Sequence, residues 1–270
     1  MISVALNHMV MPTRRFAELA AAARRLGVTD VEIRNDLPGI EIADGTAAGE
    51  LRRQAEQAGV RIVAINALQR FDDWNDTRAG EATALASYAR ECGAAALVLC
   101  PVNDPADARS QDLRAHALRT ALTALAPILR SCGITGLIEP LGFPESALRT
   151  KRAALDAIDA TAASDTFALL HDTFHHFLSG ETDLFPAATA LVHVSGVVDR
   201  SLPIASIRDM HHVLVTDDDR LGTIAQLRAL LAGGYNGSVS IEPFAPGVDN
   251  DTGLQACLGL LRSVVLPGQH

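Results

Sequence analysis

Several residue types are scarce in this chain of 270 residues, and each scarcity excludes a class of protein. Aromatic residues make up only 4% of the chain, so aliphatic side chains and alanine must fill its core. No apolar run approaches the roughly 18–20 residues that span a bilayer. The first residues also lack the basic start and small-residue cleavage site of a signal peptide. The sequence therefore predicts a globular cytoplasmic protein with no membrane partner.

Basic residues and paired cysteines are scarce too. The 23 basic residues face 32 acidic ones, which gives a net charge of −9, whereas nucleic-acid binding needs a basic surface. We therefore expect no nucleic-acid partner. The four cysteines include no Cys-x-x-Cys pair, which argues against a disulfide framework and a thiolate zinc site. Lys151 is the only lysine. We expect it to be a solvated charge at a helix start, so Schiff-base catalysis is not expected.

The chain repeats one unit, in which a short apolar run is followed by a loop and an amphipathic helix. The runs lie at residues 2–7, 29–34, 61–66, 95–100, 135–139, 167–172, 191–195 and 238–242, and the sixth helix is expected near 183–188. The runs are continuously apolar, as strands buried on both faces are. No glycine-rich phosphate turn follows the first run, which disfavours a doubly wound sheet. The sequence predicts an α/β fold, a single (β/α)8 TIM barrel over residues 1–270.

Polar residues close four consecutive runs of this predicted barrel: Glu139, Asp172, His193 and Glu242. The carboxyl ends of barrel strands form the active site. A carboxylate there is costly unless it is paired or coordinated, and three neighbouring carboxylates repel one another. A divalent cation relieves that repulsion, and three oxygen ligands with one imidazole suit Mn²⁺, Mg²⁺ or Co²⁺, with Zn²⁺ also open. We therefore predict one divalent metal ion on these four residues.

The segments around these residues strongly resemble the xylose-isomerase-like family of sugar-phosphate isomerases and epimerases. The similar segments are residues 31–34, 64–68, 138–140, 171–176, 193–196, 216–220 and 234–242, so the resemblance covers nearly the whole chain. Within the family, Glu-Ile-Arg at 32–34, Asn-Ala-Leu at 66–68 and Asp-x-Asp-Arg at 217–220 are most similar to inosose isomerases (2-keto-myo-inositol isomerases). The resemblance implies a single-domain TIM barrel, the same four metal ligands, and a place for His175 beside the substrate.

The resemblance also suggests substrate-binding residues beyond the ligands. Ketose 3-epimerases of this family carry a glutamate six residues after the fifth-strand ligand, where Glu145 stands. They carry an arginine six residues after the metal histidine, where this chain has Asp199 followed by Arg200. Trp74, beyond the third strand, could cover a sugar ring. The candidate substrate-binding residues are Glu32, Asn66, Trp74, Glu145, His175 and Arg200.

Two further features concern the surroundings of the predicted site. By strand alternation, His171 should point away from Asp172 into the helix layer, and His176 should pack on its loop. The stretch between His193 and Glu242 is much longer than that between Asp172 and His193. Its surplus lies at residues 196–222, a loop after the seventh strand that could close as a lid, because loops of this length are usually functional or mobile.

The predicted chemistry is proton transfer beside a keto group through an enediolate. The metal acts as a Lewis acid on the carbonyl and a neighbouring hydroxyl, and Glu139 and Glu242 act as bases. We expect inosose isomerisation, in inositol and carbohydrate metabolism, with a small keto-polyol or sugar as partner. The first alternative is a ketose 3-epimerase of the tagatose or psicose type. Less favoured are an inactive metal-dependent sugar-binding protein and an apurinic endonuclease, which needs more metal ligands and a basic face. Stereochemistry and oligomeric state, a homo-oligomer included, stay open.

Overall fold

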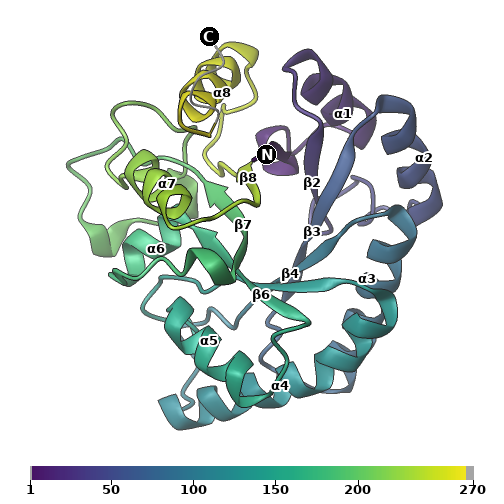
Figure 1. Ribbon diagram of the computed structural model, residues 1–270, viewed down its shortest axis with the longest axis vertical. Helices are drawn as coiled ribbons and strands as arrows, with labels where there is room; N and C mark the ends of the chain where they lie inside the picture. Colours follow the sequence, from purple (N-terminus) through teal and green to yellow (C-terminus); the bar gives the residue numbers. More distant parts are fainter. Residues whose placement is uncertain (1, 266–270) are drawn as a thin grey trace.

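The computed structural model describes residues 2–265, in which eight strands alternate with eight α-helices (Figure 1). The strands are β1 (Val4–Asn7), β2 (Asp30–Arg34), β3 (Arg61–Gln69), β4 (Ala96–Cys100), β5 (Thr135–Ile138), β6 (Phe167–Asp172), β7 (Thr189–Val194) and β8 (Ser238–Ile241). The helices are α1 (Phe16–Arg25), α2 (Ala48–Ala58), α3 (Asp76–Cys92), α4 (Gln111–Cys132), α5 (Lys151–Ala160), α6 (Thr173–Ser179), α7 (Thr223–Ala232) and α8 (Asp251–Val265).

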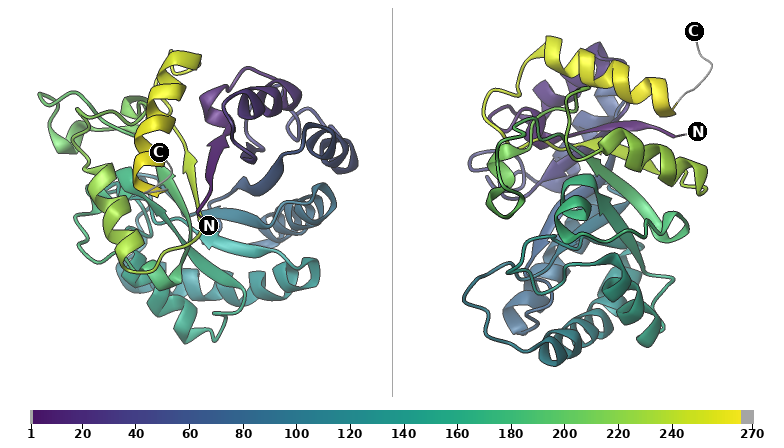
Figure 2. Two further views of the ribbon diagram at one scale, coloured as in Figure 1. Left: turned by 45° about the horizontal axis from the view of Figure 1, so that its top comes forward. Right: turned by 90° about the vertical axis from the view of Figure 1, so that its left-hand side faces the viewer.

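The eight strands form a closed barrel in chain order, and β8 pairs with β1 to complete it. All neighbouring strands are parallel, so their carboxyl ends open on one face. The helices surround the barrel, with α1 to α3 on one side and α6 and α7 on the other (Figures 1 and 2). This arrangement confirms the predicted (β/α)8 barrel. None of the described helices is long and apolar enough to cross a membrane.

Local sequence signals set the ends of these elements. Glycines in the left-handed conformation end α2, α3 and α4, because glycine reaches positive φ without steric cost. Small and aliphatic side chains, alanine prominent among them, pack inside the barrel, which explains how a chain poor in aromatics fills its core. The interior cluster is Ala64, Ala67, Ala96, Val98, Cys100, Leu137, Leu170 and Leu191.

The sixth helix lies earlier in the chain than predicted. It begins at Thr173, directly after β6, and residues 186–188 form only a short 3-10 turn. The side chain of Asp172 accepts hydrogen bonds from the backbone N–H groups of Phe174 and His175. Asp172 is therefore both the last strand residue and the helix N-cap, which removes the loop that separates strand from helix elsewhere.

The long segment at residues 196–222 lies over the carboxyl face of the barrel. Gly196 pairs with Val213 across it, and the backbone oxygen of His212 accepts the N–H groups of Phe244 and Ala245 from the loop after β8. Val197, Ile207 and Leu221 pack with Phe143 and Phe174 in a small cluster of their own. The segment is thus held in place by its own core, and its closure as a lid stays a prediction.

Candidate metal centre

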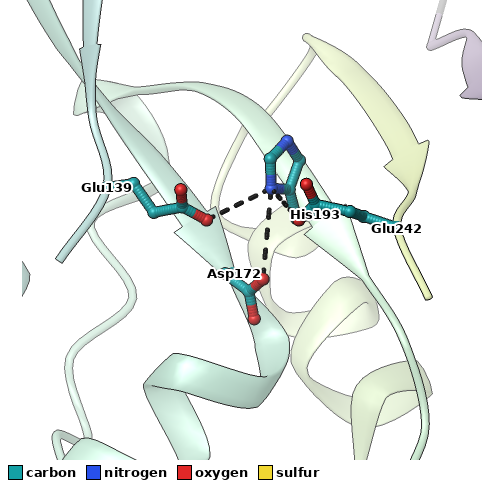
Figure 3. A group of neighbouring side chains, drawn as sticks. All are labelled: Glu139, Asp172, His193 and Glu242. Carbon is teal, nitrogen blue, oxygen red and sulfur yellow. Dashed lines mark hydrogen bonds and ion pairs between the residues drawn. The ribbon is translucent and has the colours of Figure 1, made fainter. Parts of the chain in front are cut away.

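Glu139, Asp172, His193 and Glu242 converge at the carboxyl ends of β5 to β8 (Figure 3). One potential ligand atom from each lies within 4.8 Å of the other three, and all four residues are buried. His193 Nδ1 lies 3.2 Å from Glu139 Oε1, 2.8 Å from Glu242 Oε2 and 4.0 Å from Asp172 Oδ2. Strand register produces this meeting, because Asp172 and His193 are direct partners in the β6–β7 ladder.

Each carboxylate is held by donors that leave an oxygen for the centre. Asp172 Oδ1 caps α6, which leaves Oδ2 facing His193. Glu242 Oε1 accepts from Asn7 Nδ2, Arg34 Nη1 and Asn66 Nδ2 at 3.1, 2.8 and 3.0 Å, which leaves Oε2. Three donors on one oxygen fix that carboxylate in one orientation, as a metal ligand requires.

Glu139 is held more lightly. Its Oε2 accepts from the thiol of Cys100 at 3.3 Å, and its Oε1 lies near His193. Burial raises the pKa of Cys100 well above its ordinary value, and the charge of Glu139 adds to this shift. Cys100 therefore stays a neutral thiol and a weak donor. The spacing of the cysteines in the sequence gives no signal for this contact.

Glu32 lies behind His193 and not beside the substrate space where the sequence analysis expected it. Its two carboxylate oxygens lie 3.0 and 2.9 Å from His193 Nε2, and its Oε2 accepts from Ser240 Oγ at 2.7 Å. Nε2 therefore carries the imidazole proton, and Nδ1 can present a lone pair to the centre. A carboxylate behind a histidine is the usual support of a metal-bound imidazole. The donor set and this support both fit a divalent cation.

The electrostatics of the cluster also fit a cation. Burial raises the pKa of Asp172 well above its ordinary value, and the charge of Glu139 raises it further. Burial alone would lower the pKa of His193, but the charges of Glu242 and Glu32 raise it well above 6.5. Without a metal, protons on Asp172 and His193 must offset the negative charge of the cluster. A divalent cation would replace them, so binding should release protons.

A cavity of about 500 Å³ opens beside these ligands. Its lining includes Glu139, Glu242, Asn66 and His175, so the structure brings four of the predicted site residues together there. It also includes residues that the sequence analysis did not select: Arg34, Asp36, Gln69, Arg70, Cys100, Pro101, Asn103, Leu141, Phe143, Asp209 and Phe244. Asp209 comes from the 196–222 segment. Most of the others lie within three residues of a strand end, the position that could have revealed them.

His175 enters the cavity as a neutral imidazole. Burial lowers its pKa to about 4, and the N–H of Gly142 donates to its Nδ1 at 3.3 Å. Its proton must then be on Nε2, which makes that atom a donor. A side chain on Gly142 would meet the backbone oxygen of His175 at 2.2 Å, so this close approach requires glycine.

Three other predicted substrate contacts lie outside the cavity lining. Trp74 is half-buried and packs against the main hydrophobic core. Arg200 is exposed and reaches the backbone oxygen of Asp218 at 3.5 Å. Glu145 is half-buried, and its charge acts on Asp209 at the cavity lining. Their places outside the lining follow from the paths of the loops, which the spacing of residues in the sequence does not determine.

The model of the xylose isomerase-like TIM barrel family matches residues 20–264. The chain belongs to that family. No protein with a curated function matches it. The result confirms the family that the strand-end motifs indicated.

Several solved structures have the same fold as this chain. A xylose isomerase domain containing protein from Salmonella typhimurium LT2 has 29% sequence identity and a TM-score of 0.84, over 95% of this chain and 94% of that one. The IolI protein, solved with a zinc atom, has 19% identity and a TM-score of 0.84, over 98% of both chains. D-psicose 3-epimerase from Clostridium cellulolyticum H10, solved with D-tagatose, has 16% identity and a TM-score of 0.75, over 97% and 99%.

Proposed function

We propose that this xylose isomerase-like protein is a divalent-metal-dependent isomerase of an uncharged keto-polyol, namely an inosose. The observation that carries the proposal is the convergence of three carboxylates and one carboxylate-backed imidazole beside a cavity of about 500 Å³. The similarity in fold to the zinc-containing IolI protein and to a ketose epimerase supports it. The ion would be Mn²⁺, Co²⁺, Mg²⁺ or Zn²⁺, held by Glu139, Asp172, His193 and Glu242.

The charge of the cavity favours an uncharged substrate. Arg34 and Arg70 are the arginines of its lining, and both are already paired. Arg34 contacts Asp36 and Glu242 at 2.6 and 2.8 Å, and Arg70 contacts Asp73 and Asp104 at 3.6 and 3.5 Å. Asp209 adds a further carboxylate. A phosphate or carboxylate group would therefore meet excess negative charge with no free arginine, whereas hydroxyl groups can bond to these side chains.

Each residue of the site has its own role in the proposed proton transfer. A bound divalent ion supplies Lewis-acid stabilisation of negative charge on the substrate oxygens. Glu139 and Glu242, on opposite sides of the centre, take and return the proton of the carbon next to the carbonyl. His175 Nε2 donates a hydrogen bond to a substrate oxygen on which charge develops. Return of the proton to the adjacent carbon gives isomerisation, and return to the same carbon from the other face gives epimerisation.

Ketose 3-epimerisation is the second candidate. Glu145, near the cavity, favours it, while Arg200 lies away from the lining and does not. Incubation in D₂O with 2-keto-myo-inositol, D-fructose or D-tagatose separates the two, because NMR shows which substrate exchanges a carbon-bound proton. Chelated protein should be inactive, and Mn²⁺ or Co²⁺ should restore turnover. Full activity without metal, or no exchange with any of these substrates, would refute the proposal.

A further inference from the structure

Lys151, the only lysine of the chain, is buried at the first residue of α5, and not solvated as the sequence suggested. Its Nζ donates to His171 Nδ1 at 3.1 Å, to His176 Nδ1 at 2.9 Å and to the backbone oxygen of Asp183 at 2.9 Å. An ammonium has three donors, so all three have partners. The carboxylate of Glu181, at 3.5 Å, balances its charge.

The two histidines around Lys151 act as neutral acceptors. Burial lowers the pKa of His171 well below its ordinary value and that of His176 to about 4. Because both accept at Nδ1, each carries its proton on Nε2. His171 Nε2 donates to Gln226 Oε1 of α7 at 3.0 Å, which confirms that His171 points into the helix layer. Gln226 Nε2 in turn donates to the backbone oxygen of Thr173, the first residue of α6, at 3.1 Å.

This network encloses the turn between β6 and α6. α6 has only seven residues, and a helix of that length is not stable on its own. Its position therefore depends on tertiary contacts. Phe174 anchors its inner face in the core, and His176 anchors its outer face to Lys151. Asp172 and His175 belong to the same turn and are linked by the cap hydrogen bond, so a shift of α6 would move both.

Little space separates the network from the centre. A void of about 10 Å³ is lined by Lys151, His176 and Glu181 together with Asp172 and His175. Such a volume holds about one water molecule. The network and the two site residues therefore border the same small space.

We propose that Lys151 is a positioning residue for the metal centre, whose ammonium holds the β6–α6 turn and thereby places Asp172 and His175. The inference rests on the proposed metal binding. A buried ammonium is a poor way to gain stability alone, because an apolar side chain of similar shape often serves as well or better. Its value here is in the directed contacts to His171 and His176, which an apolar chain cannot make.

The test measures metal affinity, which does not require turnover. Mn²⁺ is titrated calorimetrically into chelator-treated wild-type protein, K151M and R152M, and the unfolding free energy of each is measured without metal. Arg152 is the matched control, because it is the neighbouring residue and its side chain is 57% exposed. We expect K151M to bind Mn²⁺ about 10-fold more weakly, at the lower end of the cost of losing a residue that supports a ligand, because Lys151 acts through His171 and His176. R152M should stay within about twofold of wild type.

A second pair of variants decides the matter if K151M does not fold. H176L removes the acceptor for Lys151 on α6, whereas H176Q keeps one. Weaker Mn²⁺ binding in H176L with recovery in H176Q supports the proposal. Unchanged affinity in K151M or H176L, with only the unfolding free energy reduced, overturns it and leaves the proposed function intact. Failure of the wild-type protein to bind Mn²⁺, Co²⁺, Mg²⁺ or Zn²⁺ overturns both.

Discussion

Replacing Glu32 by glutamine should weaken metal binding although Glu32 is not itself a proposed ligand. The side chain is fully buried, and both of its oxygens lie within 3.0 Å of His193 Nε2. E32Q keeps the shape but removes the charge that holds the Nε2 proton and makes Nδ1 a stronger ligand. Loss of such a partner costs about 10- to 100-fold in metal affinity. That corresponds to about 1.4–2.7 kcal/mol of metal-dependent stabilisation at saturating metal.

Thermal unfolding with and without metal measures this loss, since each variant is compared with its own metal-free form. At this chain length 1 kcal/mol shifts the unfolding midpoint by about 2 °C, so the shift caused by metal should be smaller in E32Q by about 3–5 °C. E41Q is the control, because Glu41 is another buried carboxylate, bound to Phe16 N and Arg15 away from the centre. A metal-dependent shift in E32Q equal to that of wild type would refute the reasoning.

Three other predictions follow from the same geometry. E242Q should lower kcat by roughly 10²–10⁴-fold. Because three donors hold Oε1 of Glu242, the amide nitrogen of the variant would face the metal, so the metal content must be assayed as well. A decrease in kcat of less than tenfold with the metal retained would show that another residue is the base. H175A should lower kcat/KM by about 10²–10³-fold while the protein still binds one metal ion per chain. If the purified variant contains no metal, His175 is itself a metal ligand. In chelated protein, the unfolded chain takes up a proton on His175 at a higher pH than the folded chain does, because burial lowers the pKa of His175 to about 4. The contribution of His175 to the unfolding free energy is therefore fully present above pH 6.5 and is lost as the pH falls toward about 4. H175Q should therefore flatten the pH dependence of the unfolding free energy over this range by up to about 1.4 kcal/mol per pH unit, and equal slopes would contradict this.

The barrel and the four converging residues could be predicted because both depend on local pattern. Apolar runs with polar ends indicate where strands stop, and parallel strands bring those ends to one face. The depth at which each side chain lies along the barrel axis could not be predicted in this way. Glu32 and Arg34 share one face of β2, but two residues of strand span about 6.6 Å. Arg34 therefore reaches the cavity, while Glu32 lies beneath His193.

The burial of Lys151 depends on contacts between segments far apart in the chain. Its partners come from β6, α6 and the segment before β7, and no spacing in the sequence indicates that they meet. The sequence predicts the helix after β6 too late in the chain for a related reason. A single aspartate serves both as strand end and as helix cap, so the loop signal that marks the other helices is missing.

The burial of the only lysine also affects how this protein reacts with amine-directed reagents. Acylating labels, aldehyde crosslinkers and amine-coupling surfaces therefore find no exposed lysine on the folded protein. Lys151 becomes accessible when the contacts around α5 and α6 open. The rate at which it is acylated, read by mass spectrometry on a single peptide, would therefore report that local opening directly, without any engineered probe.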